Sequence, residues 1–239
     1  MGFQLVESLI EHLGKEEIKL IFSGSFTNCL RNHLSSPHRF LNAAVKHLLN
    51  KIIKINDKFT NEVRFELLKQ FYEVNKNIDG YSKVKVVENL IMKFDNDTIK
   101  KYIQFLKDEL VKNVKKPHLE DEEEFNRDRM QEEYVHQHRS WILLRFIHLC
   151  RVIQSPDSEA FIKSIIRFFI FFIYFRVQKF PKTVNKNSIL SVSDLNELEF
   201  IRNFDASEKL LNHSKSVLSN LLKYLSARAF DGLFFIIFF

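Results

Sequence analysis

The sequence has few of the residues that interrupt helices. Only 5 Gly and 4 Pro occur among 239 residues, well below their usual share. This scarcity argues against a turn-rich β architecture and favours long helices. The 2 cysteines, Cys29 and Cys150, are far apart and form no CxxC pair. We therefore expect no disulfide framework, which suits a reducing intracellular compartment.

Long uncharged apolar runs are also scarce. Residues 1–13 contain two Glu and a His, and they lack the basic head and apolar run of a signal peptide. The most apolar stretch, residues 161–177, contains Lys163, Arg167 and Arg176, which leave only residues 168–175 uncharged. That run is too short to cross a bilayer. We therefore expect neither signal cleavage nor a membrane span.

The composition is that of a folded protein with a moderately basic net charge. A hydrophobic content of 45% is enough to fill a real core. The 36 basic and 30 acidic residues give a net charge of +6 and a pI near 9.2. This balance permits contact with nucleic acid or with acidic partners, but requires neither.

Apolar residues recur at the helical spacing of three and four through most of the chain. After Pro37, which we take as a helix start, one apolar face comprises Leu41, Ala44, Leu48, Ile52 and Ile55. A second helix, residues 62–74, places four residues on its apolar stripe: Val63, Leu67, Phe71 and Val74. A third follows Asp95 and has the apolar row Ile99, Ile103, Leu106 and Leu110.

The second half of the chain is also predicted to be helical. The acidic run at residues 120–124 opens residues 125–153, which form one long helix or two helices joined near His138. Its predicted buried side comprises Trp141, Leu144, Ile147 and Cys150. Residues 160–177 are apolar nearly all round, as in a helix that neighbours cover on several sides. A last amphipathic helix is predicted at residues 206–226.

These patterns predict an all-α fold. Consecutive antiparallel helix pairs joined by short connections suggest a HEAT-like or armadillo-like α-solenoid, and an irregular helical bundle is the alternative. We expect a helical-repeat region at residues 1–179, a loop at residues 180–193, and further helices with an atypical apolar end at residues 194–239.

No motif indicates catalysis or a bound cofactor. His136 and His138 are two residues apart, so on a helix they point about 200° apart and do not share one metal ion. No HExxH or CxxC motif completes a ligand set. The acidic run at residues 120–124 is typical of a solvated helix start. Trp141 is expected to be a core anchor. We therefore predict no catalytic, cofactor-binding or metal-binding residue.

Basic residues are the only candidate binding groups. They concentrate at six positions, namely Lys46, Lys51, Lys54, Lys112, Lys115 and Lys116. A solenoid could gather them on one of its faces as a stripe that contacts phosphates, which would give weak, salt-sensitive binding without sequence preference. We prefer the interpretation that these lysines belong to an ordinary solvated surface, because acidic residues are interleaved with the basic residues throughout the chain.

Two stretches resemble a known family. The first is residues 20–49, where a pattern of the form F..CL.N.L...R.L..AA falls at Phe26, Cys29, Leu30, Asn32, Leu34, Arg39, Leu41, Ala43 and Ala44. The second is residues 140–175, a tryptophan-led helix, a short break and a very apolar helix, with matching positions Trp141, Arg151, Ile162, Ile166, Phe168 and Phe175. In order and spacing, they resemble the DNA polymerase V and Myb-binding protein 1A family (DNA polymerase phi).

The resemblance implies a nuclear, nucleolar protein with HEAT-like repeats that acts in transcription regulation, ribosomal RNA synthesis and ribosome biogenesis. We therefore expect a non-enzymatic scaffold for proteins of transcription or ribosome assembly. Contact with DNA or RNA through the basic residues is permitted by their charge alone, and the residues themselves predict no membrane span and no cofactor. Two rivals stay open: a general protein-interaction or transport adaptor, and a true polymerase, which would need converging metal-binding carboxylates. Family members are longer and end in a basic tail, whereas this chain ends in FFIIFF.

Overall fold

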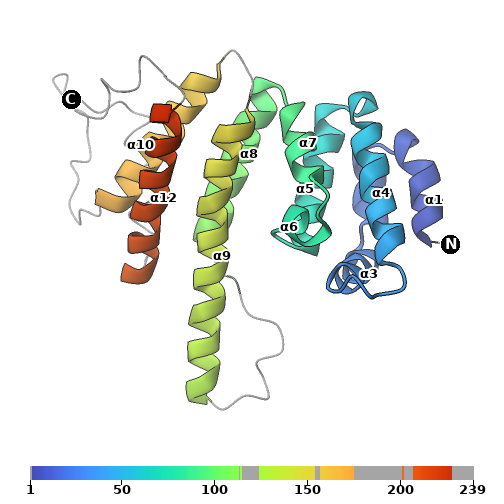
Figure 1. The fold of residues 1–239 in the computed structure, drawn as a ribbon, viewed down its shortest axis with the longest axis horizontal. Helices are drawn as coiled ribbons and strands as arrows, with labels where there is room; N and C mark the ends of the chain where they lie inside the picture. The colour runs from blue at the N-terminus through green and yellow to red at the C-terminus, as the bar shows by residue number, and fades with distance from the viewer. Residues whose placement is uncertain are drawn as a thin grey trace. The chain divides into compact units, whose positions relative to one another are not determined.

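The computed structural model describes residues 2–112, 114, 124–153, 157–174, 201 and 207–227. Every element within these ranges is a helix (Figure 1), so the predicted all-α class is confirmed. The predicted loop at residues 180–193 and the apolar end at residues 229–239 lie outside the described residues. The chain divides into two compact units, residues 1–104 with 152–155 and residues 105–151 with 156–239.

The first unit contains short and medium helices: α1 Gly2–Leu9, η1 Ile10–His12, α2 Lys15–Ile21, α3 Gly24–Leu34, α4 Asn42–Lys54, η2 Asn56–Lys58, α5 Asn61–Val74, α6 Ile78–Ser82, α7 Val86–Met92 and the first part of α8 Asn96–Val111. α1 packs on α4 and α4 packs on α7, while α2 and α3 pack on α5. Helices that are neighbours in space are thus near each other in sequence.

The α5 helix confirms the predicted stripe. Its N-cap, Thr60, accepts a hydrogen bond from the backbone of Val63 at 3.3 Å, which satisfies one of the free amides at the helix start. All four predicted residues of the stripe are buried. The row predicted on α8 is buried as well, and Asp95 caps that helix by accepting from the Thr98 amide at 2.8 Å.

The start of α4 corrects the prediction made from Pro37. The helix begins at Asn42, and a turn occupies the residues before it. Asn42 stabilises that turn, because its side-chain amide donates to the carbonyls of His33 and Ser36 at 2.8 and 3.2 Å. Leu48, Ile52 and Ile55 of the predicted row are buried, whereas Leu41 and Ala44 are half-buried. Asn42, Val45 and Leu49 complete the buried face of α4.

A buried arginine ties α5 to neighbouring segments. The Arg64 guanidinium donates to the side-chain oxygen of Asn56 at 3.0 Å, to the backbone carbonyl of Asn56 at 2.8 Å and to the side-chain oxygen of Asn61 at 2.9 Å. Asn56 in turn donates to the carbonyl of Asn89 at 2.7 Å. Burial lowers the pKa of Arg64. This network links η2, α5 and α7 through polar atoms that the core would otherwise leave without partners.

The second unit contains the end of α8, the helices α9 Glu124–Val152 and α10 Ser158–Tyr174, and the helix α12 Glu208–Ala227. α9 is one continuous helix, which settles the choice left open by the sequence. Aromatic packing joins α9 to α10, because the ring of Phe146 lies 5.6 Å from that of Phe168 and 5.9 Å from that of Phe169. α12 packs on α10.

The buried face of α9 differs from the predicted one. Leu144 is 49% exposed, and Trp141 is partly exposed, with the Arg145 guanidinium 4.8 Å from its ring centroid. Trp141 is therefore not the core anchor that we predicted. Two of the four predicted residues, Ile147 and Cys150, are buried, and the rest of the buried face is formed by Ile142, Leu143, Phe146 and Leu149.

The apolar α10 helix is buried along most of its length, as predicted. Nine of its side chains are buried: Phe161, Ile162, Ile165, Ile166, Phe168, Phe169, Phe171, Phe172 and Ile173. Within the described residues, neither this helix nor any other has the length and apolar character needed to cross a membrane.

Candidate nucleic-acid interface

Three of the six predicted lysines lie on α4 in the first unit. All three lie off the buried face of the helix, as the sequence predicts, but only Lys54 is exposed, while Lys46 and Lys51 are half-buried. This surface has mixed charge. Glu11 of η1 forms an ion pair with Lys58 and lies near Lys51, and its pKa is lowered mainly by the hydrogen bond from Lys58. Lys51 therefore faces a carboxylate from a segment forty residues earlier in the chain.

The other three predicted lysines belong to the second unit. Lys112 follows the end of α8, is exposed, and forms an ion pair with Glu109 of that helix at 2.9 Å. Lys115 and Lys116 lie outside the described residues. The structure therefore does not show the six lysines as one continuous basic stripe.

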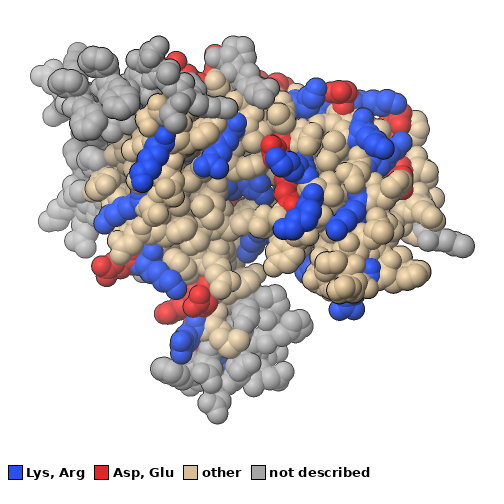
Figure 2. Space-filling view, in the orientation of Figure 1, with Lys and Arg blue, Asp and Glu red and all other residues tan. Residues whose placement is uncertain are grey.

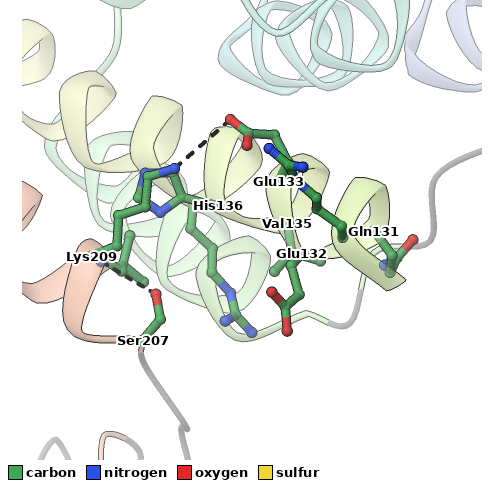
Figure 3. Close-up of a pocket in the computed structure, with 10 residues that line it drawn as sticks. Gln131, Glu132, Glu133, Val135, His136, Ser207 and Lys209 are labelled. Atoms are coloured by element: carbon green, nitrogen blue, oxygen red, sulfur yellow. Dashed lines mark hydrogen bonds and ion pairs between the residues drawn. The ribbon is translucent and has the colours of Figure 1, made fainter. Parts of the chain in front are cut away.

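A charged pocket of about 600 Å³ opens in the second unit between α9 and the start of α12. It is lined by Arg129, Gln131, Glu132, Glu133, Val135, His136, Arg139, Ser207, Lys209 and Leu210. Ser207 and Lys209 come from the α12 side, while Glu132 and Glu133 project from α9 in different directions (Figure 3). Lys209 Nζ lies 3.8 Å from a carboxylate oxygen of Glu133.

His136 does not form a catalytic pair in this pocket. Burial lowers its pKa, with further contributions from nearby Lys209 and His213. The Oγ atom of Ser140 lies 3.4 Å from its Nε2 atom, beyond the about 2.6–3.2 Å of an activated nucleophile. Its buried Nδ1 atom has no hydrogen-bond partner in the described part of the chain. The arrangement therefore lacks the group that would orient a catalytic imidazole.

The predicted divergence of the two neighbouring histidines is confirmed. His138 Nε2 lies 3.1 Å from the carbonyl oxygen of Glu109 on α8, whereas the ring centroid of His136 is 6.3 Å from that of His213 on α12. In the ranges that the structure describes, no three His, Cys, Asp or Glu side chains are grouped to hold a metal ion. Residues 120–123 of the acidic run lie outside those ranges.

Parts of α9 and α12 carry basic residues and no acidic ones. We did not identify this feature from the sequence. Residues 134–152 contain three Arg and no Asp or Glu, and residues 209–227 contain three Lys and no Asp or Glu. The structure places these stretches side by side and parallel, because Glu133 meets Lys209 near one end and Arg151 meets Tyr224 near the other. Figure 2 shows basic side chains along α12, with acidic side chains beginning at its lower end. The sequence shows that both stretches lack Asp and Glu, but it does not show that the two stretches lie next to each other.

Both cysteines are free thiols. Cys150 is buried on α9, and burial raises the pKa of its thiol to about 12. Cys29 is partly exposed on α3. A buried protonated thiol is unreactive, so Cys150 is a packing residue.

Comparisons with known proteins place this architecture in a family. The family model described as DNA polymerase phi matches residues 1–232. A curated relative, the rDNA transcriptional regulator pol5 of Schizosaccharomyces pombe, is 25% identical over 233 residues, which cover 96% of this chain and 21% of the relative. The chain thus spans about a fifth of that protein's length. No solved structure matches.

Proposed function

Because this chain belongs to the DNA polymerase phi family, as its resemblance at residues 20–49 and 140–175 indicates, we propose that it is a non-enzymatic regulator of ribosomal RNA gene transcription. The observation that carries this proposal is the likeness to a protein named as an rDNA transcriptional regulator, which extends over 96% of this chain. The proposal places the chain in the nucleus and the nucleolus, where ribosomal RNA is made.

The proposed role is that of a scaffold. The helices form an α-solenoid whose surfaces bind proteins of transcription or ribosome assembly. Support comes from the first unit, where α1, α4 and α7 pack in succession and α2 packs on α5. Nucleic acid is contacted by exposed lysines of the predicted set. Among its described members, Lys54 fits this role best, because Lys46 is half-buried and Lys51 and Lys112 already face carboxylates.

The test is association with ribosomal RNA genes in cells. We expect crosslinking of the tagged chain to enrich ribosomal DNA over other chromatin, and depletion to reduce synthesis of the ribosomal RNA precursor. Proteins that copurify with it should be those of ribosomal RNA transcription and ribosome assembly. Enrichment of transport factors without ribosomal DNA would contradict the proposal and favour the general adaptor.

The polymerase rival has a direct test of its own. A purified nucleic-acid polymerase would extend a primed template with nucleotides and Mg²⁺, since this chemistry uses metal ions held by carboxylates. We expect no extension above that of the heat-denatured chain. Template-dependent incorporation would overturn the non-enzymatic assignment while leaving the family assignment intact.

A further inference from the structure

The outward face of α12 is polar and basic along its length. Five exposed residues follow one another at spacings of three or four: Lys209, Asn212, Ser216, Ser219 and Lys223. Lys215 and Asn220 flank this row and are exposed as well. The apolar side of the helix faces inward through residues such as Leu210, Leu221 and Leu225. We call the exposed row, with Lys215 and Asn220, the α12 stripe.

The α12 stripe is free of carboxylates beyond its first turn. Glu208 is the only acidic residue of the helix, and Glu133 approaches only the first lysine, at 3.8 Å. Within the described residues, no ion pair joins Lys215 or Lys223 to an acidic side chain. The charges of these two lysines are therefore available to a ligand.

α9 adds a fourth cation at the far end of the stripe. Arg151 is exposed, and its guanidinium lies 5.0 Å from the ring centroid of Tyr224. That contact holds the arginine beside the turn of α12 that carries Lys223. From Lys209 to Lys223 the stripe is about 21 Å long, at roughly 1.5 Å per residue.

We propose that the α12 stripe, together with Arg151, is a surface that binds the phosphate backbone of duplex nucleic acid without reading its sequence. The inference deepens the proposed function, on which it rests, by assigning nucleic-acid contact to a surface outside the six predicted lysines. Lys, Arg, Ser and Asn side chains are the groups that contact phosphate and sugar, and such contacts carry no sequence information.

The composition of the stripe favours a duplex backbone over two other partners. Protein interfaces are depleted in Lys and Ser and enriched in aromatic residues, which is the reverse of what the stripe offers. Single-stranded nucleic acid is usually held by bases that stack on exposed aromatic rings. The stripe has no aromatic residue, and Tyr224 beside it is only partly exposed and lies under Arg151.

The test compares two double variants of the full chain in duplex-binding assays across a salt series. The first, Lys215→Gln with Lys223→Gln, removes two charges from the stripe. The matched control, Lys19→Gln with Lys85→Gln, removes two exposed lysines that form ion pairs with Glu16 at 3.0 Å and Glu88 at 3.1 Å. All four changes lie on exposed surface, so both variants should fold like the parent chain, as circular dichroism will verify.

We expect the stripe variant to lower the slope of log affinity against log salt concentration by about two, because each phosphate contact contributes about 0.9. At 0.1 M salt this corresponds to a roughly fifty-fold loss of affinity. The control variant should leave the slope within about half a unit of the parent. Equal losses in both variants, or an unchanged slope in the stripe variant, would overturn the proposal.

Four ligands identify the partner: duplex DNA, duplex RNA, single-stranded DNA and polyglutamate. Binding of either duplex that weakens with the stripe variant supports the inference, and the stronger duplex identifies its source. Preference for single strands, or stripe-dependent binding of polyglutamate alone, would overturn it. If no duplex binds while the chain still crosslinks to ribosomal DNA in cells, this inference fails and the proposed function stands, with partner proteins making the contact.

Discussion

Replacing Arg64 by Met is expected to destabilise the first unit by about 2–4 kcal/mol. Arg64 is 8% exposed, and Met keeps its apolar stem while removing the guanidinium. The substitution removes three hydrogen bonds of 2.8–3.0 Å to Asn56 and Asn61. Hydrogen bonds to charged groups contribute about 1.5–3 kcal/mol each, and a buried polar atom left without a partner costs about 1–3 kcal/mol. Partial relaxation keeps the loss below the sum.

The assay is urea denaturation followed by far-ultraviolet circular dichroism. Trp141 is the single tryptophan and lies in the other unit, so its fluorescence follows that unit separately. Arg39→Met is the matched control, because Arg39 is exposed before α4 and surface changes shift stability by about 0.5 kcal/mol at most. A loss of stability in Arg64→Met no larger than that in Arg39→Met would show that the hydrogen bonds of Arg64 do not stabilise the first unit.

A lysine at the same position separates charge from geometry. Arg64→Lys keeps the positive charge but replaces the planar fork by a single ammonium group, which cannot reproduce bonds to both Asn56 and Asn61. We expect it to lose at least half of the stability that Arg64→Met loses. Full stability in the lysine variant would show that charge alone, and not the forked geometry, accounts for the contribution.

Three further predictions follow from burial and hydrogen bonding. On α9, Leu143→Ala should lower the free energy of unfolding, measured by urea denaturation, by about 2–5 kcal/mol, because Leu143 is fully buried. Leu144→Ala should lower it by less than about 1 kcal/mol. Equal losses in the two variants would contradict the observed buried face of α9. The pKa of Asp95 is lowered by hydrogen bonds from the threonine three residues on, so its contribution to stability is present above pH about 4 and is lost as the pH falls through the lowered value. Asp95→Asn should therefore flatten the pH dependence of stability there, and an unchanged profile would contradict this. In native protein, a thiol reagent should modify Cys29 first and Cys150 only after unfolding; prompt reaction of both would show that Cys150 is accessible.

The sequence predicted the helices that have one clear apolar face. The stripes on α5 and α8 were correct because polar residues alternate with them at the helical period, which leaves one face to bury. The α9 prediction was correct for Ile147 and Cys150 and wrong for Trp141 and Leu144, because apolar residues occupy most of the helix circumference there. In this part of α9 the spacing of apolar residues does not specify which side of the helix is buried. The buried side is the one that contacts α10. Leu144 was therefore predicted inside and lies 49% exposed.

The candidate site was less predictable than the fold. That Lys46, Lys51 and Lys54 lie away from the core of α4 followed from spacing alone. The proximity of Glu11 to Lys51 did not, because it depends on how segments forty residues apart pack. The proximity of Arg151 to α12 was not predictable either. The sequence shows that parts of α9 and α12 lack acidic residues, but only the folded chain shows that these parts are neighbours.

The parallel pairing of α9 with α12 has a consequence for the order in which the chain folds. Residues that meet across this pair, such as His136 with His213 and Arg151 with Tyr224, are about 75 positions apart, and closing so long a loop is entropically costly before its contacts form. The contacts among α1, α4 and α7 span shorter stretches. α12 should therefore meet α9 later than the helices of the first unit meet one another, and the cation cluster that the two helices share would form at that later step.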